Sequence, residues 1–119
     1  MQWIILIGDE KLNLNAIKAI EHYENVATGT NENRYFVDYG KDHVFYDDLG
    51  NSLDDYEREE LERIPFASPH FVVMIYQSEE RMRKILQQEN FLKDIYVDND
   101  YGLIVPIEEF IKAGMPIGY

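Results

Sequence analysis

Three carboxylates lie at or just beyond the ends of predicted strands, where carboxylates can hold a metal ion. Asp9 follows the apolar run at residues 3–7, and Asp98 and Asp100 lie at a hairpin near the C-terminus. If these strands run parallel, their carboxyl ends share one edge of a sheet, where open α/β sheets bind ligands. Carboxylate oxygens suit Mg²⁺ or another hard cation. A small metal-assisted enzyme is one hypothesis, although Asp98 and Asp100 are also residue types that a hairpin turn selects.

Other catalytic motifs are missing from the chain. The histidines are His22, His43 and His70, which are too scattered for a metal-binding helix motif, and there is no Cys. No G-x-S-x-G elbow, Walker A loop or G-x-G-x-x-G sequence occurs. We expect His22 to face solvent, His43 to pair with a carboxylate, and all three to be structural. The sequence predicts no cofactor.

The charge balance excludes some classes of partner. The 119 residues carry 23 acidic and 11 basic side chains, a net charge of −12. Nucleic-acid binding needs a basic stripe, and an anionic membrane surface would repel this chain. The N-terminus lacks the basic region of a signal peptide, and its apolar run is too short to span a membrane. We expect a cytoplasmic protein.

The acidic charge is concentrated in residues 38–62, which hold ten acidic side chains and two basic ones, Lys41 and Arg58. A solvated surface explains this composition without any function. The alternative is a docking surface, in which carboxylates steer a basic protein while Tyr39, Tyr46 and Tyr56 supply contact area. The candidate partner-binding residues are Asp47, Asp48, Asp54, Asp55, Tyr56, Glu57, Glu59 and Glu60.

This docking hypothesis predicts a non-enzymatic protein that binds a basic partner. Immunity proteins that block a basic nuclease toxin use the same physics, and the likeness is one of size and charge. A third hypothesis leaves the acidic surface passive and has the chain self-associate through its aromatic hairpin. The sequence leaves the partner and the oligomeric state open.

The elements that must position these residues are organised around residues 71–76, the most β-prone apolar run. We expect this strand and the strand at residues 3–7 to be buried on both faces, at the centre of a sheet. Further strands are predicted at residues 34–39, 43–47, 95–98 and 103–105. Because a helix separates strands 71–76 and 95–98, they should form a parallel crossover.

Helix signals complete the prediction. Asn13 should cap a helix, Ser52 or Asp54 a second that runs to Arg63, and Ser78 a third, while the last begins at Pro106. Residues 27–33 are polar and contain Gly, which indicates a loop. The result is one domain over residues 1–119 of the α+β (mixed α/β) class. It has a single mixed sheet of about six strands with packed helices. Along the chain the elements follow in the order β-α-β-β-α-β-α-β-β-α.

Overall fold

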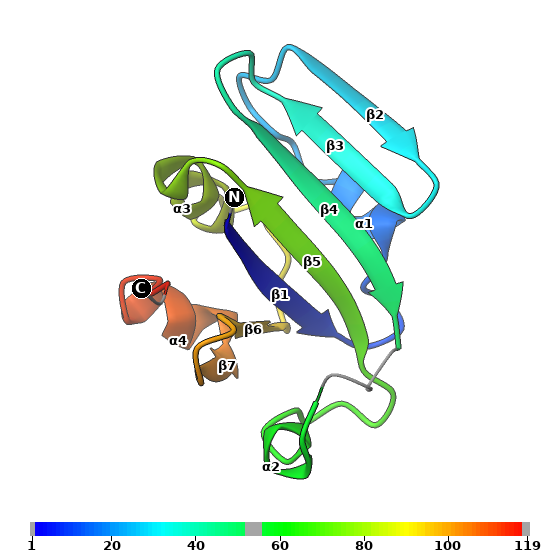
Figure 1. Ribbon diagram of the computed structural model, residues 1–119, viewed down its shortest axis with the longest axis vertical. Helices are drawn as coiled ribbons and strands as arrows, with labels where there is room; N and C mark the ends of the chain where they lie inside the picture. The colour runs from blue at the N-terminus through cyan, green and yellow to red at the C-terminus, as the bar shows by residue number, and fades with distance from the viewer. Residues whose placement is uncertain (1, 52–55, 118–119) are drawn as a thin grey trace.

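The computed structural model describes residues 2–51 and 56–117. Within them, seven strands form one sheet in the order β2-β3-β4-β5-β1-β6-β7, accompanied by four helices (Figure 1). The elements are β1 (Gln2–Gly8), α1 (Leu14–Lys18), β2 (Ala27–Asn31), β3 (Arg34–Asp38), β4 (His43–Gly50), α2 (Arg58–Leu61), β5 (His70–Tyr76), α3 (Glu79–Leu86), β6 (Tyr96–Asp98), β7 (Ile104–Pro106) and α4 (Ile107–Lys112). The α+β class is confirmed, with seven strands in place of about six.

Strands β5 and β1 occupy the middle of the sheet, as the sequence predicts. Every hydrogen-bonded strand pair is antiparallel in the described ranges, so the expectation of a mixed sheet was wrong. Strand β1 lies antiparallel between β5 and β6. The two strands of the expected crossover therefore run in the same direction, but the N-terminal strand separates them.

One face of the sheet, which we call the covered face, packs against helices α1, α3 and α4. Figure 1 shows α1 behind β3 and β4. The predicted face of the aromatic hairpin, with Tyr35, Val37, Tyr39, Val44 and Tyr46, is buried in this core. It meets helix residues that include Ile17, Met82, Ile85, Ile107 and Phe110. This burial confirms the predicted alternation, in which successive strand side chains point to the two faces in turn.

The opposite face, which we call the open face, carries no helix over β3, β4 and most of β5 among the described residues. In β5, Val72, Met74 and Tyr76 are fully buried, whereas Val73 and Ile75 are partly exposed. In β1, Trp3 is 48% exposed. The expectation that both strands are buried on two faces was therefore wrong, since continuous apolar sequence does not require a second covering layer.

Helix α2 lies at the lower end of the sheet (Figure 1), and side chains of α2 and of the residues after it cover that end of the open face. Here Ile64 packs against Phe71, Ile7 and Ile104 in a second small cluster. The predicted helix through Arg63 shrinks to the four residues of α2, and its proposed caps Ser52 and Asp54 lie outside the described residues.

Residues 27–33, predicted as a loop, contain the edge strand β2. It pairs with β3 through a tight turn in which Glu32 has a φ of 54°. A polar edge strand has little apolar pattern in its sequence, because it has a neighbouring strand on one side only and buries only part of one face. A Gly at position 29 suggested a turn, whereas it accommodates the ring of Phe36.

The helix caps are largely as predicted. Asn13 Oδ1 accepts a hydrogen bond from the Ala16 N–H at 3.0 Å, and Ser78 Oγ accepts one from the Arg81 N–H at 3.1 Å. Pro106 occupies the N-cap position of α4, so the same residue ends β7 and begins a helix. None of the helices in residues 2–51 and 56–117 has the length and apolar character needed to cross a membrane.

Candidate protein-binding surface

Four apolar side chains form a continuous row across the open face, which we call the aromatic row. Phe36 in β3 pairs with Phe45 in β4, Phe45 with Ile75 in β5, and Ile75 with Trp3 in β1. Each member is partly or largely exposed. Side chains directly opposite each other on neighbouring strands lie close enough to touch. The sheet thus presents one connected apolar strip to solvent.

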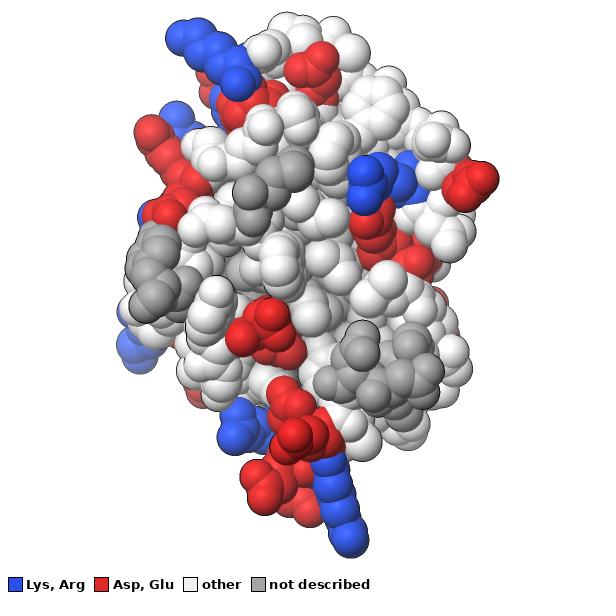
Figure 2. Space-filling model, in the orientation of Figure 1, with Lys and Arg blue, Asp and Glu red and all other residues white. Residues whose placement is uncertain are grey.

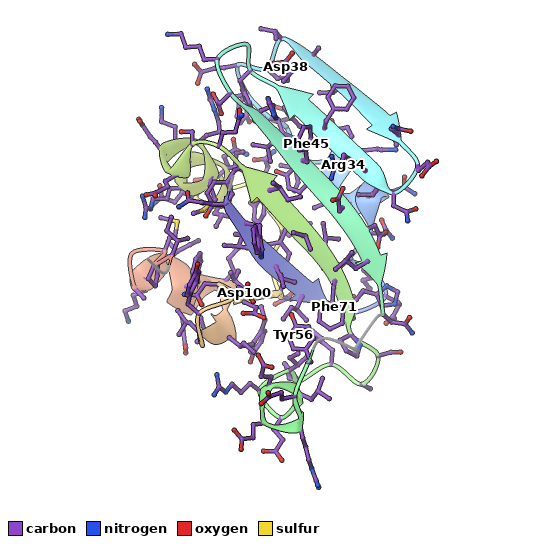
Figure 3. All side chains as sticks on the ribbon, in the orientation of Figure 1. Arg34, Asp38, Phe45, Tyr56, Phe71 and Asp100 are labelled. Carbon is purple, nitrogen blue, oxygen red and sulfur yellow. The ribbon has the colours of Figure 1, made fainter. Side chains whose placement is uncertain are left out.

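An ion pair lies beside the aromatic row on the two hairpin strands. Arg34 Nε donates to Asp47 Oδ1 at 2.6 Å, and Arg34 Nη2 donates to Asp47 Oδ2 at 2.8 Å. The guanidinium also lies 4.6 Å from the ring centre of Phe45, as their neighbouring positions in Figure 3 indicate. Asp47 is therefore neutralised by its cross-strand partner, and Arg34 helps to fix the ring.

Figure 2 looks onto this face. Uncharged surface dominates its middle, and acidic side chains gather with a few basic ones at the lower end near α2. Asp38 and Tyr56 lie at opposite ends of the face in Figure 3. The acidic segment at residues 38–62 therefore spans the molecule and does not form one patch.

Most described carboxylates of that segment already have partners within the chain. Asp48 accepts a hydrogen bond from the Gly50 N–H at 2.8 Å, and Glu60 accepts one from the Glu57 N–H at 3.0 Å. Glu59 is exposed and makes no ion pair with another described residue. Asp54 and Asp55 lie outside the described residues. The exposed carboxylates of this segment that the structure describes are those on and beside α2.

The tyrosines do not supply the contact area that the sequence suggested. Tyr39 and Tyr46 are 7% and 0% exposed because they face the covered side of the hairpin. Burial raises the pKa of Tyr39 to about 12, so both phenols stay protonated. Aromatic contact area on the open face comes instead from Phe36, Phe45 and Trp3.

Tyr56 is a structural link between α2 and the sheet. Its ring stacks on Phe71 with centres 5.0 Å apart (Figure 3). Its hydroxyl donates to Asp98 Oδ2 at 3.0 Å. Asp98 is 3% exposed, and its Oδ1 accepts a hydrogen bond from the Asp100 N–H at 2.8 Å. Burial raises the pKa of Asp98, and burial together with the nearby Asp98 charge raises that of Tyr56.

The predicted metal site is not assembled. β1 and β6 are antiparallel, with Ile5 opposite Asp98, so Asp9 lies beyond the far end of their pairing. The premise of a shared carboxyl edge was wrong. Asp9 instead accepts a hydrogen bond from the Lys11 N–H at 2.8 Å. Within residues 2–51 and 56–117, no three metal-ligating side chains come together.

His22, expected to face solvent, is 4% exposed, so that expectation was wrong. Its Nδ1 lies 3.1 Å from the Ile20 carbonyl oxygen, and its Nε2 lies 2.8 Å from the Tyr46 hydroxyl. Burial lowers the pKa of His22, which favours a neutral ring that donates through Nδ1 and accepts through Nε2. His43 packs on Phe45 with ring centres 4.7 Å apart. Both are held by structural contacts.

The aromatic row is the part of the surface that sequence reasoning missed. The alternation in residues 34–39 and 43–47 does place Phe36 and Phe45 on the other face of the strands from the buried tyrosines. That signal shows a second apolar face, but the sequence does not show that helices cover only the first. Trp3 was assigned to a buried strand for the same reason.

The fold and surface together define a small α+β protein whose antiparallel sheet is packed by helices on one face and largely exposed on the other. Comparison with protein-family models, with curated proteins and with solved structures finds no match.

Proposed function

We propose that this chain is a non-enzymatic protein that binds a basic protein partner on its open face. The observation that carries the proposal is the aromatic row, a connected apolar strip across four strands with Trp3 48% exposed. A contiguous exposed apolar patch is typical of a binding surface, since folding alone does not require it. Aromatic side chains also dominate the energy of many protein interfaces.

The charge at the rim selects the partner. Residues 57–63, on and beside α2, hold four Glu and two Arg, a net charge of −2, and the whole chain carries −12. Glu59 and Glu62 are exposed there. Carboxylates at the edge of an apolar contact accelerate association with a basic protein and disfavour an acidic one. We further propose that the chain acts as an immunity-type inhibitor, which covers the basic functional surface of a cytoplasmic partner and needs no cofactor.

Capture from a lysate of the native organism at low salt identifies the partner, and Trp3 then reports its binding. The chain has one Trp, so emission at 295 nm excitation observes the aromatic row directly when the partner lacks Trp. We expect a blue shift and reduced acrylamide quenching on binding. Trp3→Ala should weaken binding by about tenfold or more, as interface aromatics do. Tyr101→Ala is the matched control, because Tyr101 is 68% exposed and outside the row.

The charge contribution is tested separately. Glu59→Lys/Glu62→Lys should slow association and reduce its salt dependence, whereas Glu108→Lys/Glu109→Lys on α4 makes the same charge change elsewhere. Unchanged partner affinity in both Trp3→Ala and the α2 variant would contradict the proposal. So would a stable dimer of the free chain that buries Trp3, which would support self-association instead.

A further inference from the structure

The two edges of the sheet are different. Strand β7 has three residues, ends at Pro106 and continues directly into α4. Strand β2 has five residues, Ala27–Asn31, with no Pro and no charged side chain. Proteins usually protect an exposed edge with Pro, charge or a short strand, because its backbone groups can pair with another chain. In this sheet β7 has that protection and β2 does not (Figure 1).

Hydrogen bonds around β3 show which backbone groups face each neighbour. The Asp48 N–H donates to the Asn33 carbonyl oxygen at 2.9 Å, so position 33 faces β4. The Val26 N–H donates to the Asp38 carbonyl oxygen at 2.7 Å, so position 38 faces β2. Successive residues of an antiparallel strand direct their backbone groups to opposite sides. The backbone groups of the even-numbered residues of β3 therefore form hydrogen bonds with β2, and those of the odd-numbered residues form hydrogen bonds with β4.

This pattern fixes the outward groups of β2. Gly29 is opposite Phe36, an even-numbered position, so its backbone groups face β3. Thr28 and Thr30 are opposite odd-numbered positions, so their N–H and C=O groups point away from the sheet. No described strand lies on that side of β2. These two residues offer the alternating donors and acceptors that an added strand requires.

The charges beside β2 indicate what kind of strand would bind. Residues 19–33 contain Glu21, Glu24 and Glu32 and no Lys or Arg. Glu24 and Glu32 are exposed just before and just after the strand. An antiparallel second copy would bring these glutamates of the two chains together, which costs energy. A basic segment would place Lys or Arg beside them.

An aromatic ring reaches β2 from the neighbouring strand. A Cβ built on Gly29 would lie 2.4 Å from Phe36 Cζ, so the ring lies directly over the glycine. A side chain on an added strand, opposite Gly29, would therefore meet the end of the aromatic row. Arg or Lys there gains a cation–π contact as well as proximity to the flanking glutamates.

We propose that β2 binds an extended basic segment of another protein as an eighth strand of the sheet, paired to Thr28 and Thr30. The expected partner charge rests on the proposed function, whereas the outward backbone groups of β2 are distinct from the aromatic row and adjoin it only at Phe36. The segment alternates, with basic residues on the Phe36 side. Tyr23 and Val26, which are 56% and 66% exposed, provide apolar contact at the start of the strand.

A short synthetic peptide of alternating Lys and Val residues, with blocked ends, tests the edge directly. NMR hydrogen exchange should show slower exchange of the Thr28 and Thr30 amides when the peptide is bound. A Glu/Val peptide of the same length should not bind. A Lys/Val peptide N-methylated at its Val amides, which would face Thr28 and Thr30, should also fail, because that edge can no longer donate hydrogen bonds to β2.

Two substitutions at one position separate backbone pairing from side-chain effects. Thr28→Pro removes an outward N–H, which an edge strand tolerates, and should weaken peptide binding about tenfold. Thr28→Val keeps that N–H and should bind like the wild type. Equal binding by Thr28→Pro and wild type, or binding without protection of Thr28 and Thr30, would overturn the proposal. Failure of the aromatic-row proposal leaves this result unchanged, because Trp3 lies on β1, four strands from β2.

Discussion

The covered and open faces of the sheet use the same strands in different ways. In β5, Met74 is fully buried against the helices, while its neighbours Val73 and Ile75 remain partly exposed on the other side. Both faces are apolar, but only one has a layer packed over its whole width. Burial against the helices accounts for the apolar residues of the covered face. It does not account for those of the open face, which is why we propose that they bind a partner.

The largest expected effect separates the two faces within one strand. Met74→Ala should lower the free energy of unfolding by about 2–5 kcal/mol, because the lost side chain leaves a cavity in close-packed surroundings. Ile75→Ala should cost about 1 kcal/mol, since solvent already reaches that side chain. Urea unfolding measures both. Equal losses would mean that the open face is packed as tightly as the covered one.

The second effect concerns the end of the open face near α2. Tyr56→Phe keeps the stacking on Phe71 but removes the donor to Asp98, a carboxylate that is 3% exposed. Leaving that group without its partner should cost about 1–3 kcal/mol in unfolding experiments. Tyr101→Phe, at an exposed turn, is the control and should be neutral. A neutral Tyr56→Phe would show that α2 is not anchored through this hydrogen bond.

The third effect is the pH dependence of the free energy of unfolding, which depends on the buried His22 of the covered face. Burial lowers the pKa of His22 below 6.5, whereas the unfolded chain keeps the ordinary value. Below pH 6.5 the unfolded chain binds a proton that the folded protein excludes, so stability falls as the pH falls. One such group contributes at most about 1.4 kcal/mol per pH unit.

The matched variant for that pH dependence is His22→Gln. It should lose part of the decrease in the free energy of unfolding between pH 6.5 and 5, whatever its stability at neutral pH. Denaturant titrations at several pH values make the comparison. Parallel curves for wild type and variant would show that His22 does not titrate as a buried neutral ring.

The smallest effect is a coupling on the open face. Gly29→Ala should cost about 1 kcal/mol or less, because the partly exposed Phe36 ring can move away from the new methyl group. In a Phe36→Ala background the same change should be neutral or stabilising, since Ala suits a strand better than Gly. A double-mutant cycle by urea unfolding measures the difference. Additive costs would exclude the contact.

Local signals predicted much of the fold. Asn13 and Ser78 cap helices as expected, and the alternation around Tyr35 and Tyr46 gave the correct buried face. Strand neighbours were harder, because nothing local to β1 reveals that it inserts between β5 and β6. The polar strand β2 was missed because its pairing with β3 stabilises it more than its own residue types do.

The candidate site was less predictable than the fold. Charge density in residues 38–62 indicated binding, but Asp47 pairs with Arg34 and Asp48 holds a bulge. Such contacts depend on cross-strand register, which the sequence does not specify. The exposure of Trp3 depends on which face the helices cover, and that is a property of the whole chain.

The position of β1 also constrains the order of folding. Its strand partners are β5 and β6, and the pairing of Gln2 with Tyr76 joins residues 74 positions apart. During synthesis the first strand therefore emerges long before either neighbour exists, while β2, β3 and β4 can pair locally. Contacts so distant in sequence slow folding. Strand β1 must therefore remain without its sheet partners in the nascent chain until β5 has been made.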